Sequence, residues 1–212
     1  MTAVVTRSVE KELRWSAAFC ASISLIALLF HVLGTLPMAY FLTFFGVPSV
    51  LLLFLLAAFA NWINAPILLN GLAVGAVGGV IATIVYDLVR WVLNKTIFTH
   101  YYSFKAIYIF GSWITGKDIS SAEAALAGWI YHYWNGLSIA LFYVLTFGRR
   151  RWYYAVGWAL FMEACMLGLF PFFLQVTDKV DFIALSMIGH FAYGVVLGLI
   201  AQKYARNWED AV

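Results

Sequence analysis

The sequence has few charged residues, and their scarcity excludes an ordinary soluble domain. Asp, Glu, Lys and Arg make up only 11% of the 212 residues, against about 25% in soluble domains. So few charges cannot cover a water-facing surface, and 64% of the residues are hydrophobic. The net charge is only +3, and no basic stripe exists beyond residues 149–151, so we expect no nucleic acid partner.

Motifs of common catalytic and cofactor sites are also missing. The chain has no HExxH motif, no Gly-rich phosphate loop, no cysteine cluster and no nucleophile motif. Its two cysteines, Cys20 and Cys165, fall inside apolar stretches, where we expect buried small side chains and no disulfide. No small-residue cleavage site follows the first apolar stretch, so we expect no removable signal peptide. Whether the protein is an enzyme stays open at this point.

Long apolar stretches are what the sequence has in abundance, and they predict an all-α integral membrane bundle. A bilayer core takes roughly 20 apolar residues per helix, so residues 1–212 are expected to form a single membrane domain. Residues 38–45, before Pro48, are expected to be a loop or a short interfacial helix, because proline disfavours a continuous helix. The six predicted transmembrane helices cover about residues 15–35, 48–63, 68–93, 122–147, 152–174 and 181–204.

Residues 96–121, between the third and fourth predicted transmembrane helices, are unusually aromatic. They carry several Tyr, Phe and Trp residues together with Lys105 and Lys117. This composition is too aromatic for a solvated loop and too interrupted for a membrane span. We therefore predict an interfacial segment that lies along the outer membrane surface as a short helix or a re-entrant piece.

The distribution of Lys and Arg predicts how the bundle is oriented. With the N-terminus inside, the thirteen Lys and Arg residues divide eight to five in favour of the cytoplasmic side, as the positive-inside rule requires. We therefore expect a multi-pass protein of the inner (plasma) membrane with both termini in the cytoplasm. The eight are Arg7, Lys11, Arg14, Arg149, Arg150, Arg151, Lys203 and Arg206, and the five are Arg90, Lys95, Lys105, Lys117 and Lys179.

Glycines recur at four-residue spacing on two of the predicted helices. Such spacing places the small residues on one face and lets helix backbones approach closely. We expect these positions to serve helix packing. They are Gly71, Gly75 and Gly79 on the third predicted helix and Gly194 and Gly198 on the sixth.

Polar side chains within the predicted spans are the best indication of a site. An ionisable group at the centre of a span costs at least a few kcal/mol unless it is paired or hydrated. Counted from the outer ends of their helices, His132, Glu163 and His190 lie at nearly the same depth, roughly 14 Å in at about 1.5 Å per residue. His132 and His190 also share helical faces with glycines, which predicts that they point into one interior cavity. The whole set is His31, Asp87, Arg90, His132, Asn135, Glu163 and His190.

Some of these side chains have a local interpretation. Asp87 and Arg90 are three residues apart on one helix, which also suits an ion pair near the interface. His31 is close enough to the predicted outer surface to bond to headgroups or water. His132 and His190 at matched depth equally suit a structural hydrogen-bond network.

The residue types leave three classes of function open. Imidazoles and carboxylates suit a transition metal, two histidines suit the axial positions of one haem, and the same cavity suits a small ligand. A second class is a small-solute or ion transporter or channel in which these groups relay protons or ions. The third is a structural or accessory subunit; the expected partners are the lipid bilayer and other membrane subunits or further copies of the chain. The candidate site is His132, His190, Glu163 and Asp87, with His31 and Asn135 as secondary members.

Overall fold

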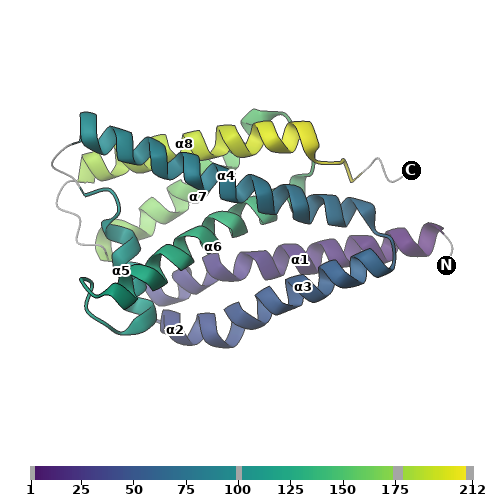
Figure 1. Ribbon diagram of the computed structural model, residues 1–212, viewed down its shortest axis with the longest axis horizontal. Helices are drawn as coiled ribbons and strands as arrows, with labels where there is room; N and C mark the ends of the chain where they lie inside the picture. The colour runs from purple at the N-terminus through teal and green to yellow at the C-terminus, as the bar shows by residue number, and fades with distance from the viewer. Residues whose placement is uncertain (1–2, 99–101, 174–178, 209–212) are drawn as a thin grey trace.

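The computed structural model describes residues 3–98, 102–173 and 179–208, and the regular elements in these ranges are all helical. The long helices lie lengthwise beside one another, with both chain ends at one end of the bundle and α5 at the other (Figure 1). The elements are α1 (Ala3–Val32), α2 (Met38–Phe41), the π-helix η1 (Leu42–Gly46), α3 (Val47–Trp62), α4 (Pro66–Thr96), α5 (Lys105–Thr115), α6 (Ala122–Phe147), α7 (Trp152–Phe173) and α8 (Lys179–Tyr204).

Four helical stretches among the described residues are long and apolar enough to cross a membrane. This finding agrees with the predicted all-helical, membrane-compatible class. It supports four membrane spans among the described residues, whereas the sequence predicts six. The predicted fourth and fifth spans form α6 and α7, which are not among the four. In α6 the middle of the helix carries Trp129, His132 and Asn135, which lower its mean hydropathy. The four stretches are Ser8–Val32, Met38–Trp62, Pro66–Thr96 and Val180–Tyr204.

The stretch before Pro48 differs from the sequence prediction of a loop or a separate interfacial helix. It is one continuous helical run with α3, interrupted only by η1. The backbone N–H of Val47 bonds to the carbonyl of Leu42, five residues back, which makes the turn wider than an α-turn. A wider turn beside Pro48 leaves room for the proline ring, which would otherwise collide with the preceding turn.

The aromatic segment 96–121 contains the short helix α5, which packs against the first half of α6. The two helices approach each other closely at a glycine on each helix, because glycine has no side chain. Gly111 of α5 lies against the backbone of Ala124, and Gly128 of α6 lies against the backbone of Ile107. A short helix is one of the two predicted forms of this segment, and its position at the membrane interface stays a prediction.

The start of α4 is held by a side chain from α1. The backbone N–H groups of Ile67 and Leu68 donate to Glu10 Oε1 at 3.0 and 2.8 Å. Glu10 is buried, so its carboxylate satisfies N–H groups that the first turn of a helix leaves unpaired. A negative charge also suits the N-terminus of a helix, and the contact ties α1 to α4 at the end of the bundle where the chain begins.

The predicted packing glycines lie at two close helix contacts. A Cβ atom at Gly79 of α4 would lie 2.9 Å from Leu137 Cα of α6, and one at Gly75 would lie 2.9 Å from Leu141 Cα. On α8, Gly194 and Gly198 face the backbone of α7. Gly71 has a looser neighbour, because its added Cβ would meet the side chain of Leu145 at 3.3 Å.

Replacing Gly194 with alanine is expected to lower the free energy of unfolding by about 1–3 kcal/mol through overpacking. The added Cβ would lie 2.6 Å from Val156 Cα, so the two backbones must separate. The control is Gly157→Ala on α7, where an added Cβ has nothing within 4 Å. Thermal unfolding in detergent should separate the two variants, and equal melting temperatures would contradict the close contact.

Candidate functional site

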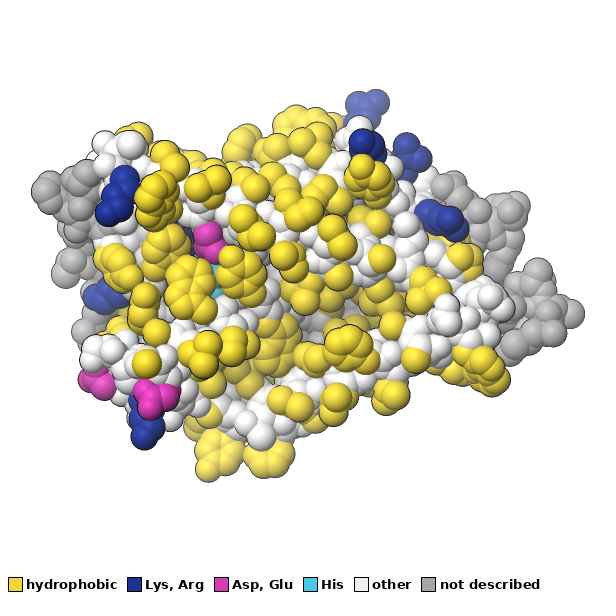
Figure 2. Space-filling view, in the orientation of Figure 1, with side chains coloured by type: hydrophobic (Ala, Val, Ile, Leu, Met, Phe, Trp, Pro, Cys, Tyr) yellow, Lys and Arg dark blue, Asp and Glu magenta, His cyan; other side chains and the backbone are white. Residues whose placement is uncertain are grey.

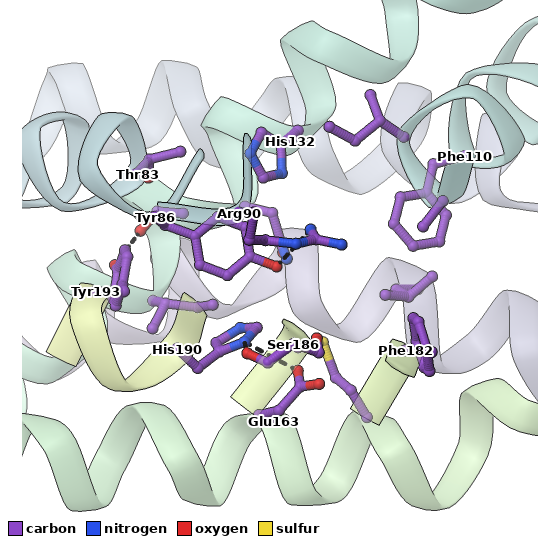
Figure 3. Close-up of a pocket in the computed structure, with 17 residues that line it drawn as sticks. Thr83, Tyr86, Arg90, Phe110, His132, Glu163, Phe182, Ser186, His190 and Tyr193 are labelled. Carbon is purple, nitrogen blue, oxygen red and sulfur yellow. Dashed lines mark hydrogen bonds and ion pairs between the residues drawn. The ribbon is translucent and has the colours of Figure 1, made fainter. Parts of the chain in front are cut away.

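A cavity of about 80 Å³ lies inside the bundle, between α4, α6, α7 and α8 and beside α1 and α5. A single water needs only about 10–15 Å³ measured in this way, so the cavity has room for several waters or a small ligand. Its wall combines apolar side chains such as Phe110 and Phe182 with polar ones (Figure 3). The polar members include Thr83, Tyr86, Arg90, His132, Asn135, Glu163, Ser186, His190 and Tyr193.

The most buried ionisable side chain of the cavity wall is Glu163 of α7, which is 1% exposed. Its Oε2 lies 3.2 Å from His190 Nδ1 on α8, and the same nitrogen lies 3.0 Å from the backbone carbonyl of Ser186. Only the Ser186 carbonyl meets hydrogen-bond geometry with Nδ1, so the Glu163 contact is a close approach between the two side chains. Neither Glu163 oxygen has a hydrogen-bond partner among the described residues. A buried carboxylate with an open oxygen normally needs a donor, because an unpaired charge is costly away from water.

A second imidazole–carboxylate pair joins α6 to α4. His132 Nε2 lies 2.9 Å from Asp87 Oδ1, and the two side chains are 16% and 13% exposed. Figure 2 shows a small patch of acidic and histidine atoms within an otherwise hydrophobic face. This pair replaces the local alternative raised by the sequence, because Asp87 bonds across to α6 and Arg90 has other partners.

Tyr86 and Arg90 of α4 connect the two pairs. The Tyr86 ring contacts both imidazoles, with ring centroids 5.8 Å from His132 and 4.9 Å from His190. Arg90 Nη1 donates to the Tyr86 hydroxyl at 2.8 Å, and Nη2 donates to the backbone carbonyl of Ser103. Arg90 is 4% exposed and forms no ion pair with a carboxylate in the described part of the chain. The cavity therefore holds a buried cation and a buried anion that do not pair with each other.

The structure places the sequence-predicted residues in three different settings. His132, Glu163 and His190 line one cavity, and Asn135 lines it too while accepting a hydrogen bond from Ser24 Oγ at 3.2 Å. Asp87 lies behind His132 as its partner. His31 lies outside the cavity. Its ring packs at a tilt against Trp113, with ring centroids 4.4 Å apart, and its Nδ1 accepts a hydrogen bond from the Met38 N–H at 3.2 Å. His31 thus steadies the turn from α1 into α2.

Several cavity residues were not identified from the sequence. Tyr86 carries no charge, so nothing distinguished it from the many other aromatic residues. Arg90 was counted among the polar side chains of the spans but was left out of the candidate site, although it is buried and lines the cavity. Ser186 lies one helical turn before His190, and that spacing on one face was the available signal.

The arrangement offers little for a metal or a haem. In the described ranges, no three His, Cys, Asp or Glu side chains are grouped so that they can hold a metal ion. The Tyr86 ring contacts both imidazoles, and a cavity of about 80 Å³ is smaller than the roughly 150 Å³ that accepts benzene. A porphyrin does not fit in such a space. The groups present suit hydrogen bonding to a small molecule that supplies a donor to Glu163 and an acceptor to Arg90.

Comparison with known proteins adds no assignment. The chain matches no protein family, no curated protein and no solved structure.

Proposed function

We propose that this chain is a multi-pass integral membrane protein of the plasma membrane whose interior cavity binds a small polar ligand. The four apolar stretches support a membrane location. Figure 2 supports it as well, because charged side chains gather toward the ends of the bundle and hydrophobic ones cover the face between them. In the proposal α6 and α7 complete six crossings, since both are long helices that run beside the other four (Figure 1).

The proposed orientation places both termini in the cytoplasm, because they lie at the same end of the bundle as the link between α6 and α7 (Figure 1). That link holds Arg149, Arg150 and Arg151, and the positive-inside rule places such a cluster in the cytoplasm. Reporter domains inserted at Arg150 and fused after residue 212 should both report the cytoplasm. A reporter inserted between α5 and α6 should report the opposite side. A periplasmic signal at Arg150 or at the C-terminus would contradict this topology.

The ligand part of the proposal rests chiefly on Glu163. Glu163 is 1% exposed and lies in the wall of a cavity, and neither of its carboxylate oxygens has a hydrogen-bond partner among the described residues. The opposite charge in that wall is Arg90, whose Nε also lacks a hydrogen-bond partner among the described residues. Burying such groups lowers stability, and their retention around a cavity is typical of a site that completes its bonds with a bound molecule.

Native mass spectrometry of the protein released from mild detergent tests this function. The wild-type protein should retain a bound small molecule, and Glu163→Gln should reduce its occupancy about tenfold through loss of a hydrogen bond to a charged group. Glu123→Gln is the matched control, because it removes an exposed carboxylate at the start of α6. Equal occupancy in wild type and Glu163→Gln, or no bound molecule in the wild type, would refute the proposal.

Proton transfer is a second candidate, supported by two imidazole–carboxylate pairs, His132 with Asp87 and His190 with Glu163, beside a cavity that has room for several waters. One pair is partly exposed and the other is buried. Liposomes with a trapped pH-sensitive dye and an imposed membrane potential would measure proton flux. Flux that falls in both His132→Ala and Glu163→Gln supports transfer, whereas flux equal to that of protein-free vesicles excludes it.

A further inference from the structure

An apolar groove of about 170 Å³ runs between α1 and α7. Its lining is almost entirely hydrocarbon and sulfur, from Leu25, Leu29 and Val32 of α1 and from Met162 and Cys165 of α7. Leu29 and Cys165 are exposed, so the groove opens on the outside of the bundle. It exists because α7 packs mainly against α8 and touches α1 only sparsely.

The groove adjoins the polar cavity. Leu28 and Met166 line both spaces, and they form the wall that the two share. Met166 lies three residues after Glu163, on the same side of α7. Methionine is unbranched and has several rotatable bonds, so a change in its rotamer can join the groove to the cavity without moving a helix.

From this continuity we propose that the ligand is a lipid-like molecule with a small, uncharged, hydroxyl-bearing head in the cavity and an apolar chain in the groove. The inference rests on the proposed function and adds the class of ligand and its route of entry, sideways from the membrane between α1 and α7. An open groove of about 170 Å³ is comparable to the roughly 150 Å³ that accepts benzene. The chain extends from the groove toward the surrounding lipid.

The charges in the cavity determine which headgroup the ligand can have. Arg90 and Glu163 carry opposite formal charges in one enclosed space, so an added charge on the ligand would remain unbalanced in a medium of low dielectric constant. A hydroxyl group offers both a donor for the Glu163 carboxylate and an acceptor for Arg90. Three atoms of these two side chains lack hydrogen-bond partners among the described residues, namely Glu163 Oε1, Glu163 Oε2 and Arg90 Nε. A cavity of about 80 Å³ also excludes a bulky phosphodiester headgroup.

Photo-crosslinking of the full-length protein in lipid nanodiscs tests the inference. The probe is a long-chain primary alcohol with a diazirine in its chain, and crosslinked residues are mapped by peptide mass spectrometry. We expect crosslinks to concentrate on α1 residues 25–32 and α7 residues 162–166, above the level on the lipid-facing side of α3. Excess unlabelled alcohol should reduce them about tenfold, whereas the alkane of equal length and the corresponding long-chain amine should not.

Two variants complete the test. Leu29→Trp should fill the groove and remove the crosslinks, while Leu52→Trp, on a similarly exposed leucine of α3, should leave them unchanged. Equal competition by the alkane, or no enrichment in the groove, would overturn the inference. If the crosslinking result contradicts the lipid-like ligand but native mass spectrometry still shows a bound molecule that depends on Glu163, the proposed ligand-binding function stands. If native mass spectrometry shows no bound molecule either, the inference and the proposed function are both wrong.

Discussion

Replacing His190 with alanine should lower the free energy of unfolding by about 3–5 kcal/mol, the usual cost of leaving a buried charge without its partner. The variant leaves Glu163, at 1% exposure, without the imidazole that lies 3.2 Å away. The cost of removing the charged carboxylate from water is then no longer offset by a neighbouring imidazole. Reversible denaturation in mixed detergent, followed by circular dichroism, measures the change.

The double variant His190→Leu/Glu163→Leu should recover most of that loss, because apolar side chains in place of a buried pair are often neutral or stabilising. His31→Ala is the control histidine, since His31 lies outside the cavity at the turn into α2. The single changes His190→Leu and Glu163→Leu, which complete the cycle with this double variant, should therefore be strongly non-additive. Additive losses would mean that the two side chains do not form a coupled pair.

Replacing Arg90 with methionine should lower the free energy of unfolding by about 3–6 kcal/mol, since Arg90 donates two hydrogen bonds and each bond to a charged group contributes roughly 1.5–3 kcal/mol. Arg90 donates to the Tyr86 hydroxyl and to the Ser103 carbonyl. The second bond fastens the segment that leads into α5 to the end of α4. Hydrogen exchange should therefore show faster exchange across α5 (Lys105–Thr115) as well as a lower global stability.

Arg90→Lys should fall between wild type and methionine, because lysine keeps the charge but loses the planar fork that reaches both acceptors. Arg151→Met is the surface control and should change stability by no more than about 0.5 kcal/mol, since Arg151 is exposed. Unchanged exchange across α5 in Arg90→Met would show that the Ser103 contact does not hold this segment.

Helix periodicity and the position of residues along their helices predicted much of the candidate site. Two histidines at matched depth on glycine-bearing faces were predicted to point inward, and His132 and His190 do line one cavity. Depth placed His31 near the end of its helix, away from the other two histidines, but it does not reveal which neighbouring segment a residue there contacts. The His31 ring packs on Trp113, which follows it by many residues.

The partner of Asp87 shows why spacing along one helix was insufficient. Arg90 is three residues away and suits a local pair, but its side chain extends to Ser103, and α6 brings His132 to Asp87. A similar limit applies at Pro48, where the sequence predicts a break and a π-turn instead keeps the helix continuous. Both outcomes depend on neighbouring atoms that no periodicity describes.

The sequence by itself determined the helical class, the apolar stretches and the depth of the buried polar groups, because these depend on composition and on a fixed rise per residue. Only the tertiary structure decided which polar groups pair with each other. It also decided that Arg90 and Glu163 line the same cavity without pairing with each other, and that a groove between α1 and α7 adjoins this cavity. The physical reason is that pairing depends on helix rotation and neighbour order. Those follow from close contacts such as Gly79 on Leu137 and Gly194 on Val156.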